Sequence, residues 1–263
     1  MLSNVAGSGL AMNRYYNLWK NFKNWWLYLA FKYGLTDSEP LVFNTRNGVT
    51  VEVPHRLVQT FKEIFMDECY LAGLEKDISP GATIIDIGAN AGYFTLFAAD
   101  KFPRSQIFSF EPVPVNYIQL QRHRDLNKTR DIKCFPLAVA GQAGEITLSF
   151  DAHDSFSTSA TMFTHENTRE VSLKVPCVSL QEIMDEHNII KCDLLKMDCE
   201  GAEYDILYNT STGYLQRIDQ IALEVHCGKE NNQNIDALEA FLNQQGFFTR
   251  RRPVGMLWAW RCR

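Results

Sequence analysis

Asp86-Ile87-Gly88-Ala89-Asn90-Ala91-Gly92-Tyr93-Phe94 decides the fold expected for this chain. The apolar run 82–85 precedes it, and residues with helical apolar spacing follow it. A strand, a glycine-bearing turn and a helix form a ligand cradle in open α/β sheets, with the ligand above the carboxyl end of the strand. Gly88 and Gly92 allow close backbone approach or positive φ. A tight turn without a ligand is the alternative, which the Asp before the turn and the Asn within it disfavour.

The composition predicts one large globular α/β core. Of the 263 residues, 46% are hydrophobic and 22% are charged, which is ordinary for a protein with ample apolar surface to bury. The net charge of −5 gives no indication of nucleic acid binding. The seven cysteines show neither C-x-x-C nor zinc-ligand spacing, which favours reduced thiols in a cytoplasmic protein. Neither a membrane-spanning run nor a signal peptide is expected.

Residues 13–33 are predicted to form a basic helix with an aromatic face. Nine of them are aromatic, and the segment carries a charge of +4 whereas the rest of the chain carries −9. Helical spacing places five side chains on one face: Tyr15, Trp19, Phe22, Trp26 and Leu29. Such a helix can lie on the periphery of a membrane or bind a partner. The favoured alternative is that it packs onto the core or closes the substrate pocket.

An N-terminal extension is expected at 1–76 and the ligand-binding domain at 77–263. Within the extension, Asn47-Gly48 between two alternating runs predicts a β-hairpin over 41–53. A helix is expected to follow at 56–74, with apolar residues on one face.

From Thr83 onward, predicted strands alternate with predicted helices. The strands are 83–87, 106–110, 132–138, 192–197 and 219–225, and the helices lie near 92–101, 114–127, 202–208 and 234–245. This alternation favours a mostly parallel sheet with helices on both faces. Two further strands, 145–150 and 171–177, bracket a long loop, and residues 247–250 and 256–260 are expected to form a closing antiparallel pair.

Glu111 is the second indication of a nucleoside-containing ligand. It ends the second predicted strand, where a carboxylate can accept hydrogen bonds from both hydroxyls of an adenosine ribose. Nicotinamide dinucleotides and S-adenosylmethionine share this requirement. A dinucleotide site prefers G-x-G-x-x-G, whereas this turn reads Gly88-x-Asn90-x-Gly92 after Asp86. A carboxylate there repels pyrophosphate but can help to hold the zwitterionic end of S-adenosylmethionine, so the methyl donor is favoured.

Acidic residues gather at the ends of the later predicted strands. Asp198, Glu200 and Glu203 follow one apolar strand, and Glu224 and His226 share one face at the end of the next. The alternative is that these acids only complement the positive N-terminal end of a helix dipole, which accounts for Glu203 but less readily for Asp198. Six residues are thereby expected along the ligand-binding edge of the sheet: Asp86, Glu111, Ala138, Asp198, Glu224 and His226.

Three motifs in order resemble the FkbM family of S-adenosylmethionine-dependent methyltransferases. They are Asp86-Ile-Gly-Ala-Asn-Ala-Gly-Tyr-Phe, Phe110-Glu111-Pro112-x-x-x-Asn116 and Leu195-Lys196-Met197-Asp198-x-Glu200-Gly201-Ala202-Glu203, and Glu63-Ile64-Phe65…Glu68-x-Tyr70 is similar to the family's lead-in helix. The resemblance covers roughly 41–226. It implies the Rossmann-like class I methyltransferase fold, with a mostly parallel seven-stranded sheet, and O-methylation of a sugar, polyketide or other secondary metabolite.

The resemblance assigns expected roles to individual residues. By the resemblance, the cofactor site comprises Asp86, Gly88, Asn90, Gly92, Glu111 and Asn116. Tyr93, Ala138, Asp198 and Glu68 are also expected in the cofactor site. Glu200 and Glu203 match the acidic signature of the family. Residues 1–40 lie outside the resemblance.

Methyl transfer to a hydroxyl requires a group that removes its proton. His226 is the first candidate, because a neutral imidazole is ordinarily available near pH 7, and Asp198 and Glu224 follow. These acids can alternatively bind Mg²⁺, which lowers the pKa of an acceptor. The long loop 151–170 includes Ser155 and Ser157, which are expected either to hydrogen bond the acceptor as part of a lid or to lie in a mobile surface loop.

Two other functions remain open at this stage. A nicotinamide-dependent oxidoreductase fits the strand-turn-helix pattern, but the residues of the turn do not match the dinucleotide-binding motif. A non-catalytic protein that binds S-adenosylmethionine or a partner would use the aromatic N-terminal helix as its interface. The sequence names no methyl acceptor and predicts no nucleic acid partner.

Overall fold

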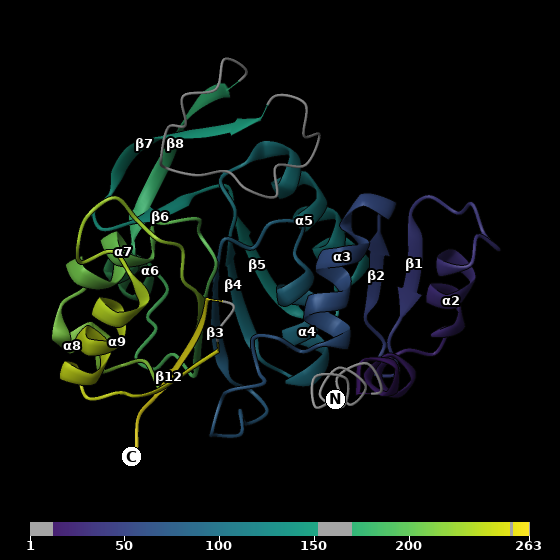
Figure 1. Ribbon diagram of the computed structural model, residues 1–263, viewed down its shortest axis with the longest axis horizontal. Coiled ribbons are helices and arrows are strands. Elements are labelled where there is room, and N and C mark those ends of the chain that lie inside the picture. The colour runs from purple at the N-terminus through teal and green to yellow at the C-terminus, as the bar shows by residue number, and fades with distance from the viewer. Residues whose placement is uncertain (1–12, 152–169, 253–254, 263) are drawn as a thin grey trace, which may run out of the picture.

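The computed structural model describes residues 13–151, 170–252 and 255–262. Its centre is a seven-stranded sheet in the order β11-β12-β10-β9-β3-β4-β5 (Figure 1). The strands are β3 (Thr83–Ile87), β4 (Gln106–Phe110), β5 (Asp131–Phe135), β9 (Leu194–Met197), β10 (Gln220–Glu224), β11 (Phe248–Arg251) and β12 (Met256–Trp260). From β5 to β10 neighbouring strands are parallel, and β12 is antiparallel to both β10 and β11. This is the class I methyltransferase-like α/β fold that the sequence predicts.

Helices cover both faces of the sheet (Figure 1). On one face lie α4 (Tyr93–Lys101) and α5 (Pro114–Leu126); on the other lie α6 (Leu180–Glu186), α7 (Glu203–Asn209), α8 (Thr212–Leu215) and α9 (Ile235–Gln244). Alternate residues of one strand serve the two faces, because successive side chains of a strand point in opposite directions. Ile84 packs in the hydrophobic cluster that includes α4, and Ile85 packs in the cluster that includes α7 and α9.

Local sequence accounts for where several helices begin. Gly92, with φ of 88°, precedes α4 in a left-handed conformation that glycine adopts without strain. Ser179 and Glu182 form a reciprocal capping box at the start of α6. The Asn234 side chain accepts a hydrogen bond from Ala237 N at the start of α9.

The predicted strand 132–138 is wrong as a single element. β5 ends at Phe135, and β6 (Ala138–Ala140) belongs to a second, three-stranded sheet with β7 (Gly144–Asp151) and β8 (Glu170–Ser179). Pro136 lies between the two strands and has no N–H for a ladder, so the chain leaves the central sheet there. The second sheet lies against the carboxyl ends of the central strands and carries Ala138 with it (Figure 1).

The predicted helix 56–74 is shorter and less regular than expected. It consists of η1 (His55–Leu57), α3 (Val58–Phe61) and the π-helical turn η2 (Lys62–Met66). Glu68 then adopts a φ of 50°, which an α-helix does not accommodate, so the helical segment ends before it. The preceding hairpin is confirmed: β1 (Leu41–Asn44) pairs antiparallel with β2 (Thr50–Val53).

The N-terminal segment forms two helices, not one helix with a single aromatic face. One helix covers 13–21, and α2 (Trp26–Lys32) follows after Phe22 makes an isolated β-bridge with Thr45. Phe22 is fully buried, whereas Trp26 is 57% exposed, so the two residues lie on different faces. The single-face prediction failed because this bridge to the hairpin turns the chain.

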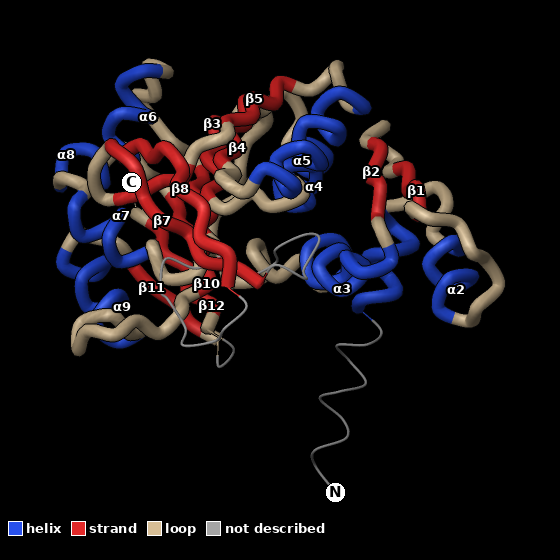
Figure 2. The backbone as a smooth tube through the Cα atoms, turned by 90° about the horizontal axis from the view of Figure 1, so that it is seen from above, coloured by secondary structure: helices blue, strands red, loops and turns tan. Residues whose placement is uncertain are grey.

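The N-terminal elements pack onto the sheet domain. Phe22 contacts Phe43, Phe61 and Phe65 with ring centroids 5.3–5.5 Å apart, and the cluster continues to Phe97 of α4. Figure 2 shows β1, β2 and α2 at one end of the molecule, with α3 between them and the rest. This packing agrees with the favoured alternative for residues 13–33, while a domain boundary at residue 77 stays a prediction. None of the helices within the described ranges is long and apolar enough to cross a membrane.

Candidate functional site

Two cavities adjoin at the carboxyl ends of the central strands. The first, named the Glu111 cavity, is lined by residues from the ends of β3, β4 and β9 and from the second sheet, including Ala138. The second, named the His226 cavity, has a volume of about 930 Å³ and extends from the same turn to the end of β10 and the helix over 13–21. Four residues line both cavities: Gly88, Asn90, Asp198 and Glu200. A ligand bound in one cavity therefore lies next to a ligand bound in the other.

Gly88 is required by the packing of the turn itself. A Cβ built at this position lies 1.8 Å from the backbone oxygen of Asp198, which is far closer than atoms can approach, and φ of Gly88 is 70°. The amides of Gly88 and Ala89 also donate to the Phe110 carbonyl. The glycine thus brings the ends of β3, β4 and β9 together.

Glu111 presents a buried carboxyl group to the first cavity. Its two oxygens accept hydrogen bonds from the amides of Asn90 and Val113, each at 2.8 Å. Burial nevertheless outweighs these bonds and the interaction with Asn116, and raises the pKa of Glu111 to about 7. Each carboxylate oxygen has a further lone pair, so the group retains acceptor capacity for two hydroxyls.

Asp86 and Gly92 line neither cavity. Asp86 is fully buried, where its Oδ2 accepts from Thr95 Oγ1 at 2.7 Å and its Oδ1 lies 3.1 Å from Lys196 Nζ. Lys196 in turn donates to the Gly88 carbonyl at 2.8 Å. Asp86 therefore faces neither cavity, and the expectation that it helps to hold S-adenosylmethionine stays a prediction. The Asp86 carboxylate orients Lys196, and Lys196 in turn stabilises the turn by its hydrogen bond to the Gly88 carbonyl.

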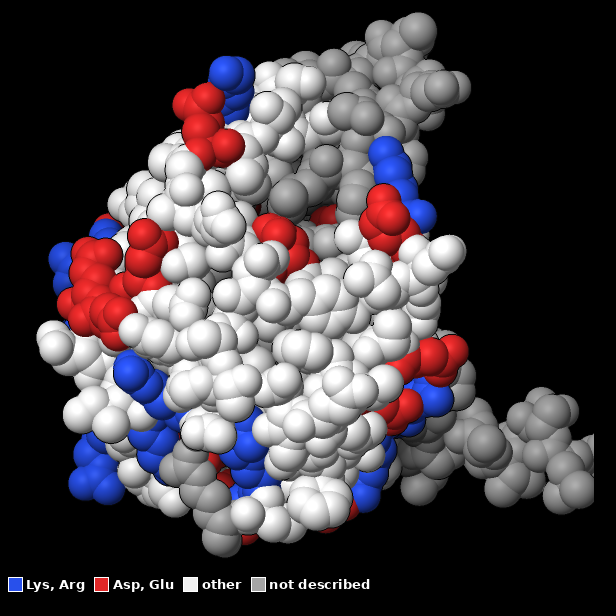
Figure 3. Space-filling view, turned by 90° about the vertical axis from the view of Figure 1, so that its left-hand side faces the viewer, with Lys and Arg blue, Asp and Glu red and all other residues white. Residues whose placement is uncertain are grey.

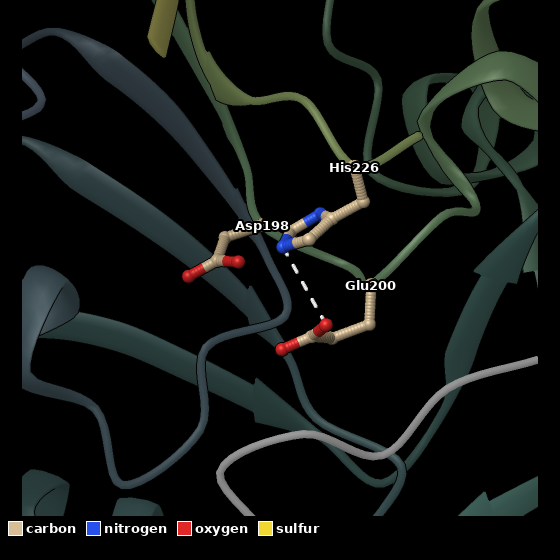
Figure 4. Close-up of side chains that lie close together, drawn as sticks. All are labelled: Asp198, Glu200 and His226. Atoms are coloured by element: carbon tan, nitrogen blue, oxygen red, sulfur yellow. Dashed lines mark ion pairs between the residues drawn. The ribbon is translucent and has the colours of Figure 1, made fainter. Parts of the chain in front are cut away.

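Asp198, Glu200 and His226 converge at the junction of the cavities. Each offers one polar atom within 4.8 Å of the others, and Figure 4 shows the three side chains lying close together. Asp198 and Glu200 follow β9, and His226 follows β10. His226 Nε2 lies 3.5 Å from Glu200 Oε2. Asp198 Oδ2 accepts a hydrogen bond of 2.7 Å from the hydroxyl of Tyr70. The set can hold a proton or a cation between its oxygen and nitrogen atoms.

Glu203 is buried behind this cluster and reaches neither cavity. Its carboxylate accepts from the amides of Cys199 at 3.1 Å and Gly201 at 2.9 Å, and its Oε1 lies 3.1 Å from His226 Nδ1. As the first residue of α7 it also suits the positive end of the helix dipole. Glu203 therefore holds the imidazole of His226 through Nδ1, and Nε2 faces the cavity.

The cluster changes the acidity of its members. Burial favours the neutral imidazole, but the hydrogen bond that His226 donates to Glu203 and the charges of Glu203, Glu200 and Asp198 outweigh it, and the pKa of His226 rises to about 9. The neutral imidazole expected near pH 7 is thus the minor form. Burial raises the pKa of Glu200 to about 7, against the opposing charge of His226. Burial also raises the pKa of Glu224, which lines the same cavity.

The remaining predicted residues lie around the His226 cavity or outside the described ranges. Tyr93 and Glu68 line this cavity; Tyr93 donates to the Glu52 carbonyl, and Glu68 pairs with Lys101 at 2.6 Å. Ser155 and Ser157 lie outside the residues that the structure describes.

Three residues of this site had no predicted role. Tyr70 and Lys196 stood within the quoted motifs, and a lysine inside the apolar run 194–197 was the available signal. Arg14, on the helix over 13–21, lines the His226 cavity and pairs with Asp67 at 2.6 Å. One wall of this cavity therefore comes from the N-terminal segment.

The chain is similar to known methyltransferases. Residues 86–249 match the model of the methyltransferase FkbM domain. Methyltransferase 1 of Beauveria bassiana is 26% identical over 83% of this chain and 90% of that protein. The 31-O-demethyl-FK506 methyltransferase FkbM of Streptomyces tacrolimicus is 29% identical over 63% and 73%, and the hexuronic acid methyltransferase AglP of Haloferax volcanii is 27% identical over 54% and 55%. The crystal structure of methyltransferase FkbM from Methylobacillus flagellatus has a TM-score of 0.47 at 13% identity, over 78% of this chain and 54% of that one.

Proposed function

Because this chain belongs to the FkbM methyltransferase domain family, we propose that it is an S-adenosylmethionine-dependent O-methyltransferase for a hydroxyl of a neutral small molecule or glycan. The observation that carries the proposal is the position of Glu111. Its buried carboxyl group lines one cavity, and that cavity adjoins, at Asp198 and Glu200, a second one that is large enough for an acceptor. A nicotinamide-dependent oxidoreductase is not favoured by the family.

The residues of the Glu111 cavity fit the proposed cofactor. Glu111 would accept from the ribose hydroxyls, and Asn116 and Ala138 would lie beside the nucleoside. The carboxylates of Asp198 and Glu200 would face its positive charges. When bound, S-adenosylmethionine supplies a methyl group on a positively charged sulfur. The protein contributes orientation of the acceptor and removal of its proton.

The charges of the His226 cavity favour a neutral acceptor. Asp67 and Glu68 are already paired with Arg14 and Lys101. Lys196 also lines the cavity, but it is paired with the buried Asp86. The other carboxylates of the lining outnumber the nearby cations His226 and Arg252: they are Glu63, Asp198, Glu200 and Glu224. An anionic acceptor would add to this negative charge. The name of the Haloferax relative describes an acidic substrate, so we expect this chain to differ from it in the acceptor.

Two groups of the cluster are suited to take the acceptor proton. Glu200, whose pKa is about 7, is an effective base from neutral pH upward, whereas His226 becomes one only as pH approaches 9. A rate that levels off near pH 7 assigns the role to Glu200, and a rate that still rises toward pH 9 assigns it to His226. Glu200→Gln and His226→Gln, assayed across this range, separate the two.

A bound divalent cation is the alternative to direct proton transfer. Asp198, Glu200 and His226 offer two carboxylate ligands and one imidazole ligand, a set that suits Mg²⁺ through its oxygens and Mn²⁺ through all three. Activity that survives EDTA and dialysis removes this alternative. Loss that is restored by Mg²⁺ or Mn²⁺ supports it.

The proposal is tested by binding and by transfer. Calorimetry is expected to show binding of S-adenosylmethionine and S-adenosylhomocysteine, but not of NADH, and Glu111→Ala is expected to weaken that binding by at least tenfold. Asp125→Ala, which removes an exposed carboxylate from α5, serves as the matched control. A screen of hydroxylated compounds with a labelled methyl donor then identifies the acceptor. Binding of NADH in place of S-adenosylmethionine would refute the proposal.

A further inference from the structure

The N-terminal helices present an aromatic and basic surface on the side that faces away from the sheet. Its exposed rings are Tyr15, Tyr16, Trp19, Trp26 and Tyr33, and its cations are Lys20, Lys23, Lys32 and Arg46. We name this set the aromatic–basic surface. Leu18, Phe22 and Tyr28 of the same helices are buried against the body of the protein. The helices are thus anchored by one side and leave large amphipathic rings on the other.

Side-chain contacts join six of these residues into two groups, which meet at the adjacent residues Tyr15 and Tyr16. Arg46 lies over the ring of Trp19, and this ring contacts that of Tyr16 with centroids 6.0 Å apart. Next to Tyr16 in sequence, Tyr15 accepts a hydrogen bond of 2.7 Å from Lys32 Nζ. Lys32 also lies 5.6 Å from the ring centroid of Tyr33.

The cations of this surface are not neutralised by carboxylates. Within 13–151, 170–252 and 255–262, no ion pair joins Lys20, Lys23, Lys32 or Arg46 to an acidic side chain. The chain has no acidic residue before Asp37. On the body side, by contrast, Arg14 pairs with Asp67.

The opposite end of the molecule differs. Figure 3 shows that face, on which Lys and Arg lie among Asp and Glu. The protein therefore combines a negative net charge with a basic surface that is rich in aromatic rings and has no carboxylate partner among the described residues. An anionic ligand is expected to be directed to that surface.

We propose that the aromatic–basic surface binds the headgroup region of an anionic lipid membrane. Tryptophan and tyrosine prefer this region because an apolar ring and a polar N–H or O–H are both accommodated there, and lysine and arginine attract anionic headgroups. Rings and cations occur together on this surface, which is the pattern of an interfacial helix. The inference does not depend on the proposed catalytic function.

Membrane binding would bring the His226 cavity close to lipid. The helix over 13–21 lines this cavity through Arg14 and Asn17 and carries Tyr16 and Trp19 on its exposed side. The cavity wall and the lipid-binding side are therefore separated by about one helix diameter, on the order of 10 Å.

Co-sedimentation of the full chain with vesicles tests the proposal. Binding is expected to vesicles of phosphatidylcholine and phosphatidylglycerol in equal amounts, to be much weaker with phosphatidylcholine alone, and to fall as salt is added. Replacing Lys20, Lys23 and Lys32 together by Gln is expected to weaken binding by about 100-fold. The matched control replaces Lys174, Lys191 and Lys229, which lie in β8 and in the segments before β9 and α9, and is expected to bind as wild type.

An aromatic pair of variants tests the contribution of the rings. Trp19→Ser is expected to weaken vesicle binding, whereas Phe248→Ser, which removes a similarly exposed ring from β11, is expected to leave it unchanged. Thermal melting of each variant verifies the fold. Absence of binding to the anionic vesicles, or equal loss in the control variants, would overturn the proposal. Light scattering that shows self-association abolished by Trp19→Ser, without vesicle binding, would assign the surface to a second copy of the chain instead.

Discussion

Replacing Glu203 by Gln is expected to lower the pKa of His226. Glu203 Oε1 lies 3.1 Å from His226 Nδ1, and Glu203 is fully buried. At this distance a full charge contributes about 5 kcal/mol at an effective dielectric constant of about 20. Burial of the imidazole opposes this attraction. The difference between an ordinary histidine and a pKa of about 9 corresponds to roughly 3 kcal/mol.

Glu203 is the first cause that raises the pKa of His226, so its replacement should reverse much of the change. We expect the pKa of His226 to fall by roughly one to two units in Glu203→Gln, because Glu200 and Asp198 still favour the imidazolium. The sign is definite: loss of a negative charge beside an imidazolium favours the neutral ring. If neutral His226 is the base, the pH at which kcat/KM levels off should move down by the same amount.

The measurement is an NMR titration of the histidine ring signals, with the His226 signal identified by its absence in His226→Gln. Asp205→Asn is the matched control, since Asp205 lies on the same helix and accepts a hydrogen bond of 2.6 Å from Gly141 N instead of from His226. A wild-type His226 pKa near 6.5, or a pKa that Glu203→Gln leaves unchanged, would refute the reasoning.

Three other predictions concern the turn and the charge of the site. Gly88→Ala is expected to reduce the free energy of unfolding by about 3 kcal/mol or more, because its Cβ would overlap the Asp198 carbonyl. Gly81→Ala is the control: Gly81 also has a positive φ but has open space around it, so we expect a loss of only about 1 kcal/mol. Equal losses of the two variants in chemical denaturation would contradict this. Lys196→Met is expected to cost roughly 3 kcal/mol by leaving Asp86 buried without its cation, and the addition of Asp86→Asn should recover part of the loss in the same assay. Binding of the cationic methyl donor near pH 8 should release protons from the cluster of Asp198, Glu200 and His226. Calorimetry in buffers of different ionisation enthalpy measures this release, and binding enthalpies that do not depend on the buffer would argue against it.

The strands of the central sheet were predictable because their signals are local. For β3 and β4 the predicted bounds were correct, and those of β9 and β10 were wrong by no more than two residues. Each of these strands is a mostly apolar run with an acidic residue at its end or next to it, and neither feature depends on distant partners. The break after β5 also had a local signal, because Pro136 lies within the predicted strand 132–138 and has no N–H to donate to a neighbouring strand.

Features that depend on contacts between distant residues were not predictable in this way. The path of the N-terminal segment changes where Phe22 meets Thr45 of the hairpin. The pairing of Asp86 with Lys196 requires the register of two strands far apart in sequence. The pKa of His226 results from burial, which lowers it, and from the carboxylates of Glu203, Glu200 and Asp198, which raise it. A pattern along the sequence identifies such residues as candidates, but it does not give their charges in the folded state.

The two acidic motifs therefore contribute differently to this site. Asp86 opens the motif most typical of a methyltransferase, yet it is buried, engaged by Thr95 and Lys196, and reaches neither cavity. Glu200 and Glu203, which follow β9, pair with His226, and Asp198 and Glu200 line both cavities. A cation bound at that junction would relieve their mutual repulsion, whereas one bound near Asp86 would compete with Lys196. The electrostatic contribution to cofactor binding is thus expected to come from the ends of β9 and β10, while the first motif provides the shape of the turn.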